Sequence, residues 1–129
     1  MKRSTDMILS IGIDTVTISN VERFLRHPEY ANEIFTEKEQ KLAEEYGDVV
    51  DAYASSFAAK QAVKKVLDHF MDVDGLDLRR VEILKNKGIP YVKPDKEIQK
   101  VLDEKGVKNI MVTITSEGDN ATAFVIAQQ

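Results

Sequence analysis

The sequence predicts an α+β protein in which a mostly antiparallel sheet packs on one long central helix. The predicted elements follow the order β-α-α-α-β-β-α-β-β, in which most strands come in consecutive pairs and not as alternating strand–helix units. The longest helical stretch, residues 49–71, carries apolar side chains on several sides. Such a helix is typically buried against more than one neighbour.

The composition is that of one ordinary globular domain. The 129 residues are 43% hydrophobic and 31% charged, and we expect residues 1–129 to form a single domain around one core. No apolar run approaches the roughly 18 residues that a membrane span needs. A net charge of −4 argues against broad nucleic-acid binding, which needs a basic face. The short apolar run at residues 7–13 predicts a strand and not a secretory signal, so we expect a cytoplasmic protein.

Several kinds of active site are disfavoured by residue types that are absent or scarce. The chain contains no cysteine, which removes disulfides, thiolate nucleophiles and cysteine-based zinc sites. Its two histidines, His27 and His69, lie far apart in the sequence. A histidine-rich metal site or a Ser-His-Asp triad is therefore poorly supported.

The first predicted elements follow from an apolar run and from residues that punctuate helices. Residues 8–14 form a largely apolar run that predicts a buried strand ending at Asp14. Ser19 or Asn20 can cap a short helix, and Pro28 follows its end.

Capping residues also predict the next two helices. Thr36 and Glu39 have the spacing of a capping box, in which each side chain satisfies an unpaired backbone amide. The helix that they open ends at Gly47. Asp48 then caps the long helix over residues 49–71.

The C-terminal half predicts two strand pairs separated by a helix. Apolar residues between 81 and 91 flank the turn sequence at residues 86–88, which is typical of a hairpin. Residues 94–95 open a helix by their Pro-Asp sequence. Two further strands, at residues 110–115 and 121–127, are joined by a polar turn.

Two places could meet a ligand through a carboxylate or through exposed backbone. Asp14 stands where a hydrophobic strand ends, and there it can hold a divalent cation or simply cap the next helix. The turn at residues 88–90 exposes backbone that could approach a ligand or merely close the hairpin. The residues alone leave both alternatives open.

The long helix carries polar and basic residues that allow a second pair of interpretations. Phe57, Gln61 and Lys65 follow one another at intervals of four and therefore share one side of the helix. These polar groups predict either a wet cleft or, more ordinarily, a satisfied amide and a lysine that reaches water. Lys60, Lys64 and Lys65 form a basic cluster that could meet phosphates or an acidic partner, or could be a solvated face.

A series of motifs along nearly the whole chain resembles the holo-acyl-carrier-protein synthase family. The Phe-Ala-Ala-Lys segment and the order of the series are the most specific features. The motifs are Ile11-Gly12-Ile13-Asp14, Phe35-Thr36-x-x-Glu39, Phe57-Ala58-Ala59-Lys60-Gln61-Ala62-x-x-Lys65, Gly88-Ile89-Pro90-Tyr91, and Val112-Thr113-Ile114-Thr115-Ser116 followed by Ala121-x-Ala123.

The resemblance implies a fold, a reaction and partners. The fold is that of the 4′-phosphopantetheinyl transferases, whose members include homotrimers with active sites between subunits. The reaction moves the 4′-phosphopantetheine arm of coenzyme A to a serine of acyl carrier protein, with Mg²⁺, and releases 3′,5′-ADP. Charge that builds on the phosphate oxygens during this transfer needs a cation and lysines nearby.

The resemblance also assigns roles to individual residues. It implies that Asp14 and Gln61 hold Mg²⁺, and that Lys60, Lys65 and Asp14 are catalytic. The residues that it implies bind coenzyme A are Lys60, Lys65, Gly88, Pro90 and Ser116.

Four positions depart from the family pattern. Gln61 stands where the family has a metal-binding glutamate, and Ser116 where it has a histidine; Asn20 and Ser56 replace arginines. The amide of Gln61 lacks the charge of a carboxylate and cannot act as a general base, so we expect weaker metal binding. Three hypotheses follow: a transferase with an altered metal site, a relative that binds coenzyme A or carrier protein without transfer, and an interaction protein that keeps only the trimeric fold.

Overall fold

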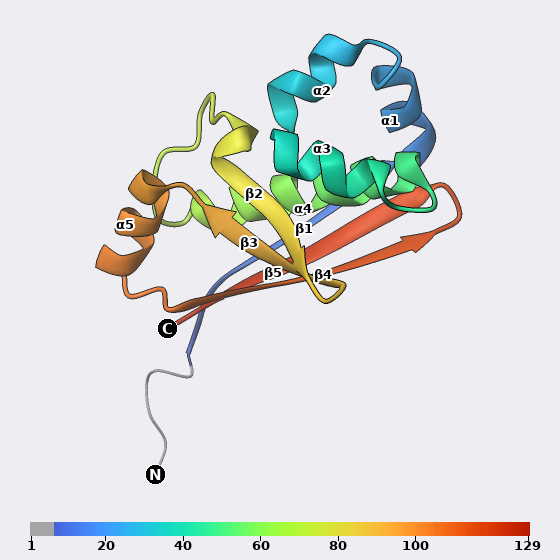
Figure 1. The fold of residues 1–129 in the computed structure, drawn as a ribbon. Helices are drawn as coiled ribbons and strands as arrows, with labels where there is room; N and C mark the ends of the chain where they lie inside the picture. Colours follow the sequence, from blue (N-terminus) through green and yellow to red (C-terminus); the bar gives the residue numbers. More distant parts are fainter. Residues whose placement is uncertain (1–6) are drawn as a thin grey trace.

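The structure is a computed structural model that describes residues 7–129 (Figure 1). It confirms the predicted α+β class. None of the helices in this part of the chain is long and apolar enough to span a bilayer. The elements are β1 (Ile8–Thr17), α1 (Ile18–Phe24), α2 (Pro28–Ile34), α3 (Glu37–Glu44), α4 (Val49–Leu67), the short 3₁₀ helix η2 (Leu78–Arg80), β2 (Val81–Asn86), β3 (Ile89–Pro94), α5 (Lys96–Glu104), β4 (Asn109–Glu117) and β5 (Asn120–Gln128).

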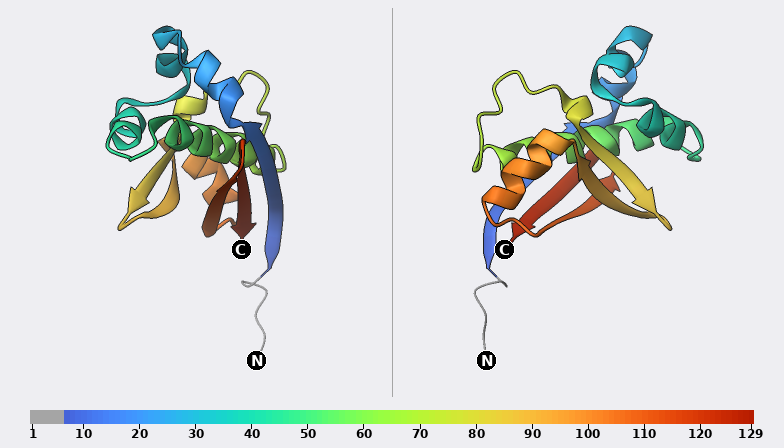
Figure 2. Two further views of the ribbon diagram at one scale, coloured as in Figure 1. Left: turned by 90° about the vertical axis from the view of Figure 1, so that its right-hand side faces the viewer. Right: turned by 60° about the vertical axis from the view of Figure 1, so that its left-hand side comes forward.

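The strands form two separate antiparallel sheets. One has three strands in the order β1-β5-β4, and the other is the hairpin β2-β3. Helix α4 crosses the molecule, with α1 to α3 gathered near its start and α5 near its end (Figure 1). In Figure 2 the hairpin is a two-stranded ribbon of its own, which contacts β4 through β3 but pairs with no strand of the three-stranded sheet.

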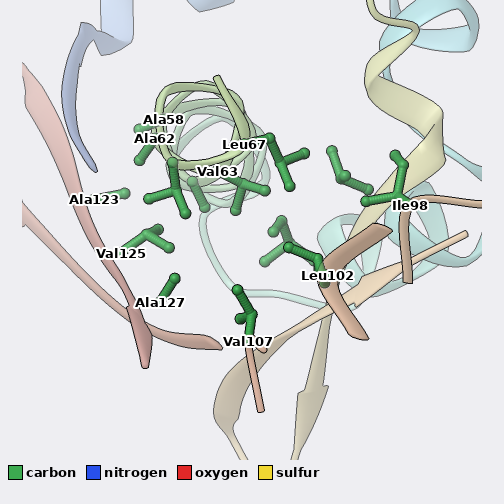
Figure 3. Packing of buried hydrophobic residues seen from close by; sticks show 14 residues of the cluster. Ala58, Ala62, Val63, Leu67, Ile98, Leu102, Val107, Ala123, Val125 and Ala127 are labelled. Carbon is green, nitrogen blue, oxygen red and sulfur yellow. The ribbon is translucent and has the colours of Figure 1, made fainter. Parts of the chain in front are cut away.

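Small side chains let α4 lie close to the three-stranded sheet. Ala54, Ala58 and Ala62 recur every fourth residue on α4 and are completely buried. The central strand β5 meets this stripe with equally small residues, which are Ala121, Ala123, Val125 and Ala127. On another side of α4, Val63 and Leu67 belong to the same core cluster as the buried residues of α5 (Figure 3). The prediction of a central helix buried on several sides is therefore confirmed.

Strand β1 approaches the backbone of α4 closely at Gly12. A Cβ atom at this position would lie 2.3 Å from the backbone oxygen of Ala62 and 3.2 Å from the Cβ of Lys65. Only glycine leaves room for the helix backbone here. The contact fixes how far along α4 each residue of β1 lies.

The structure corrects the predicted limits of two elements. The first strand continues to Thr17, beyond the predicted end at Asp14, because its pairing with β5 continues as far as Asn120. The long helix ends at Leu67 and not at residue 71. Its last backbone bonds tighten to the three-residue spacing, as in the bond from the Phe70 amide to the Leu67 oxygen.

One prediction around the first helices is confirmed and another was wrong. Pro28 follows the end of α1 as predicted, and it also begins α2, where its missing N–H costs no hydrogen bond. The cap of α1 is neither Ser19 nor Asn20 but Thr17, whose side chain makes no capping bond. Asp119, in the distant β4–β5 turn, instead accepts hydrogen bonds from the Ser19 amide at 3.0 Å and from its hydroxyl at 2.6 Å.

The other predicted N-terminal helix caps and the hairpin turn are confirmed, whereas α3 ends at Glu44 and not at the predicted Gly47. Thr36 and Glu39 form the capping box of α3, and Asp48 and Asp95 accept bonds from the first turns of α4 and α5. The β2–β3 turn contains Gly88, whose φ is +81°. This left-handed conformation is the one that a tight hairpin turn requires.

We expect the substitution Gly12→Ala to destabilise the fold by at least about 2 kcal/mol, because the new methyl group meets backbone and not a side chain that can move. Urea unfolding measures the effect. Gly47→Ala is the matched control, since a Cβ there would meet nothing within 4 Å. Equal stability of the two variants would contradict the close approach of β1 to α4.

Candidate functional site

Asp14 and Lys65 meet where β1 crosses α4. The Lys65 ammonium donates to the Asp14 Oδ1 atom at 3.1 Å and to the backbone oxygen of Ile13 at 2.8 Å. The Asp14 side chain is 20% exposed, while that of Lys65 is 56% exposed. An ion pair this open to water adds little stability, so its cation can turn toward another anion at small cost.

Gln61 lies on the same stretch of α4 as this pair. The strand β1 runs antiparallel to α4. The Ser10 hydroxyl donates to the Val66 oxygen, Gly12 lies against Ala62, and residues 15–17 line the same hollow as Phe57. This order places Gln61 at the level of Asp14, one helical turn before Lys65. Gln61 is half-buried. The convergence of the first strand and the middle of the long helix, which the sequence predicted, is therefore present.

A hollow of about 390 Å³ lies along the residues of β1 that follow Asp14 and the turn of α4 that precedes Gln61. Its lining is mostly apolar and includes Phe24, Phe57 and Val21, together with Thr15 and Asn20. The rings of Phe24 and Phe57 stack with their centroids 6.4 Å apart. A polar contact pair beside an apolar hollow is an arrangement suited to a ligand with a charged part and an uncharged arm.

Lys60 does not join Asp14 and Lys65, although the sequence predicted that it would. Its side chain is fully buried, and its ammonium lies 2.8 Å from the Oε1 atom of Glu39. Residues five apart on a helix point about 140° apart, so Lys60 and Lys65 face different sides of α4. In this conformation the Lys60 ammonium cannot reach a phosphate at the Asp14 site, which corrects the placement that the resemblance implied.

Burial dominates the ionisation of this enclosed pair. It raises the pKa of Glu39, while the attraction of Lys60 and the hydrogen bonds from the Ile83 and Thr36 amides act in the opposite direction. Burial also lowers the pKa of Lys60, against the attraction of Glu39. The attraction between the two groups therefore opposes the free-energy cost of removing both charges from water. Removal of one partner would leave the other as an unpaired buried charge.

A second cavity, of about 290 Å³, collects the other sequence-predicted residues. Gly88, Pro90 and Ser116 all line it. The hydroxyl of Ser116 donates to the Oδ1 atom of Asp51 at 2.6 Å. The Ser55 hydroxyl donates to the same atom at 3.3 Å, so one carboxylate organises two hydroxyl groups.

Asp51 and Ser55 were missed by the sequence analysis. Asp51 stands in the first turn of α4, where an acidic residue is ordinary because the helix N-terminus favours negative charge. The only local signal was the spacing of four that puts Ser55 above Asp51. The hydroxyl of Ser56, a position where the family has arginine, is buried in the cavity lining without a hydrogen-bond partner among the described residues.

The two groups of candidate residues lie on opposite edges of the three-stranded sheet. Asp14 on β1 is opposite Ala123 of β5, and Ser116 on β4 is opposite Ala121. Both side chains are on the face that α4 covers, with α4 lying over β5 between them. One chain therefore presents two partial sites and does not bring Ser116 to Asp14.

The comparisons with known proteins agree with one another. Residues 10–125 match the model of the 4′-phosphopantetheinyl transferase superfamily. The holo-[acyl-carrier-protein] synthase of Alkaliphilus oremlandii is 32% identical over 123 residues, which are 94% of this chain and 99% of that protein. The corresponding synthase of Caldicellulosiruptor bescii is 33% identical over 95% of this chain and 100% of that protein.

Solved structures show the same fold. The holo-[acyl-carrier-protein] synthase of Neisseria meningitidis has a TM-score of 0.84 and 27% identity, over 95% of this chain and 100% of that chain. The synthase of Helicobacter pylori, solved in complex with coenzyme A, has a TM-score of 0.74 and 22% identity, over 92% and 99%.

We expect Lys60→Met to destabilise the fold by about 3–5 kcal/mol near pH 8, because Glu39 loses its buried partner. The substitution removes the attraction that lowers the pKa of Glu39, so this pKa rises further. A carboxyl group with a raised pKa favours the fold only below that pKa, and the loss must therefore grow as the pH rises. Urea unfolding of the variant and the wild type at pH 5 and pH 8 measures it; a difference that is independent of pH would contradict the assignment.

Proposed function

This chain belongs to the 4′-phosphopantetheinyl transferase superfamily, and we propose that it moves 4′-phosphopantetheine from coenzyme A to a serine of acyl carrier protein. The proposal depends above all on the contact of Asp14 with Lys65 where β1 crosses α4. The relatives that it matches over almost their full lengths are holo-acyl-carrier-protein synthases. We further propose that the protein works in the cytoplasm, since residues 8–13 are built into strand β1.

In the proposed reaction, the serine oxygen of the carrier attacks the phosphorus that bears the pantetheine. The bond from this phosphorus to the bridging oxygen breaks, and 3′,5′-ADP leaves. Lys65 supplies positive charge to the phosphate oxygens as negative charge builds there, since its ammonium is exposed enough to leave Asp14. Gln61 cannot accept the serine proton, so Asp14 is the carboxylate of this partial site that would take it.

We propose that Mg²⁺ binds at Asp14 and Gln61. The Asp14 carboxylate and the Gln61 amide oxygen are hard donors of the kind that this cation prefers, although one contact of Asp14 is shared with Lys65. The residues that the structure describes contain no cluster of three or more His, Asp or Glu side chains that could hold a metal ion. Substrate phosphates and water must then supply most ligands, and the bound ion would neutralise charge on the diphosphate.

We propose that the partial sites are completed by neighbouring copies in a homotrimer. The outer face of the three-stranded sheet carries exposed apolar side chains, with Ile11, Ile13 and Met111 each more than half exposed. Ile11 and Met111 flank Ile126 in register, so the residues form a continuous band. A band of this kind marks a protein interface. A neighbour docked there could bring its Ser116 cavity toward Asp14.

A second candidate function is binding of coenzyme A or carrier protein without transfer. Two substitutions favour it over transfer, and a remaining cavity favours it over the third hypothesis, which keeps only the fold. Gln61 replaces the family's metal-binding glutamate, and Ser116 replaces its histidine while its hydroxyl donates a hydrogen bond to Asp51. Both changes reduce catalytic chemistry, yet the cavity beside Gly88 and Pro90 remains.

Incubation with apo-carrier protein, coenzyme A and Mg²⁺ tests the transfer. Mass spectrometry is expected to show the carrier gaining one phosphopantetheine group. Lys65→Met and Asp14→Asn should each slow the transfer roughly 100-fold or more, as expected for lost stabilisation of transferring phosphate charge. Lys64→Met, which removes the same charge from the position directly before Lys65, should keep nearly full activity.

Gln61→Glu is expected to lower the Mg²⁺ concentration at half-maximal activity roughly tenfold, because it adds a carboxylate ligand. No gain of carrier mass with any of these proteins, beside a competent synthase, would contradict the transferase function. Calorimetric binding of coenzyme A by such an inactive wild type would favour the second candidate.

Sedimentation velocity tests the trimer. The wild type is expected to sediment as a trimer, and Ile11→Asp as a monomer, because the new carboxylate would be buried in the interface. Val49→Asp is the matched control, since Val49 is also exposed but lies at the start of α4, away from this sheet face. A wild type that stays monomeric at micromolar concentration would contradict the homotrimer.

A further inference from the structure

Lys60 makes an enclosed polar link for which the proposed chemistry has no use. Its ammonium has three N–H groups and three acceptors: Glu39 Oε1 at 2.8 Å, the Leu78 oxygen at 2.7 Å and the Val81 oxygen at 2.9 Å. The side chain is fully buried. All of its hydrogen-bonding capacity is thus used to join α4 to η2, to the start of β2 and to Glu39 of α3.

Glu39 completes the link from α3. Its Oε1 atom also accepts from the Thr36 amide at 2.9 Å, and its Oε2 atom accepts from the Ile83 amide at 2.8 Å. Its side chain is 1% exposed. The carboxylate therefore ties the N-terminus of α3 to the backbone of β2, while its partner Lys60 ties both to α4.

The hairpin β2–β3 depends on such a link more than an ordinary strand would. It pairs with no strand of the three-stranded sheet, so no hydrogen-bonded ladder fixes its position relative to the rest of the fold. Packing of Val81 and Ile83 in the core attaches the hairpin but does not fix its orientation, because apolar contacts are not directional. The bonds of Glu39 and Lys60 to the backbone at Leu78, Val81 and Ile83 fix this orientation.

The three elements joined by this link are also walls of the 290 Å³ cavity. Glu39 and Ala43 come from α3, Asp51 and Ser55 from α4, and the hairpin contributes residues that include Ile83, Gly88 and Pro90. A shift of the hairpin would move Gly88 and Pro90 relative to Asp51. The geometry of the cavity therefore depends on the contact between Glu39, which is part of its wall, and Lys60, which lies behind that wall.

We infer that Lys60 and Glu39 are positioning residues that set the affinity for coenzyme A by holding the hairpin wall of this cavity. The inference rests on the proposed function, since it takes the cavity to bind part of coenzyme A. Neither side chain need touch the substrate. The role differs from direct phosphate binding by Lys60, because it predicts a change in KM and not in kcat.

The double variant Glu39→Gln/Lys60→Met tests this role. It is nearly isosteric, leaves no buried charge, and keeps an acceptor for the Ile83 amide while cutting the link to α4. We expect the KM for coenzyme A to rise about tenfold, the size expected for losing hydrogen bonds to a charged group. The kcat should stay within about twofold, and hairpin amides should exchange hydrogen faster in the absence of substrate.

Arg79→Gln is the matched control, because Arg79 lies in the same turn η2 but makes an exposed pair with Asp77. It should leave the KM and the exchange of the hairpin amides unchanged. An unchanged KM in a folded double variant would overturn the inference, as would a loss confined to kcat. If the double variant does not fold, Glu39→Gln alone should show a smaller rise in KM; no rise would overturn the inference.

A wild type that transfers nothing would refute the proposed function by itself. The same variants would then be compared by calorimetric titration with coenzyme A and by hydrogen exchange. Weaker binding with faster exchange would still support the positioning role. Equal binding, or no binding by any of the proteins, would overturn it.

Discussion

The close approach of β1 to α4 at Gly12 determines where the candidate site lies. Because no side chain separates the strand from the Ala62 backbone, the next residue of β1 on the same face, Asp14, comes within reach of Lys65. The alanine stripe of α4 extends this close packing across β5. The same packing places α4 between the two edges of the sheet, which is why Asp14 and Ser116 are separated within one chain.

Helix α4 makes two kinds of charged contact, one exposed to water and one buried. The contact of Lys65 with Asp14 is open to water and can be rearranged, which suits a group that meets a substrate. The contact of Lys60 with Glu39 is sealed, and burial opposes the charge on both partners. A buried pair of this kind adds little net stability, so its main effect is to position the backbone groups that it binds. Helix α4 therefore carries an exposed lysine that can reach a substrate and a buried lysine that binds backbone groups.

Features that depend on neighbours in the sequence could be predicted, whereas those that depend on distant partners could not. The capping box of Thr36 and Glu39 and the turn at Gly88 need only local spacing, and both are present. The hydrogen bonds from Ser19, at the start of α1, to Asp119 required knowledge of a turn about 100 residues away. The meeting of Asp14 and Lys65 was predicted from the resemblance and the helical spacing. The burial of Lys60 was not, although the angle between positions 60 and 65 already argued against a shared site.

The central claim is that a divalent cation and the diphosphate of coenzyme A meet at Asp14, beside Gln61 and Lys65. Nuclear magnetic resonance with coenzyme A and Mn²⁺, a paramagnetic substitute for Mg²⁺, locates the ion most directly. The account predicts that the amide signals of Ile13, Asp14, Thr15 and Gln61 broaden first as Mn²⁺ is added. Broadening centred on the Asp51 and Ser116 cavity with Asp14 unaffected, or no broadening at all, would contradict it.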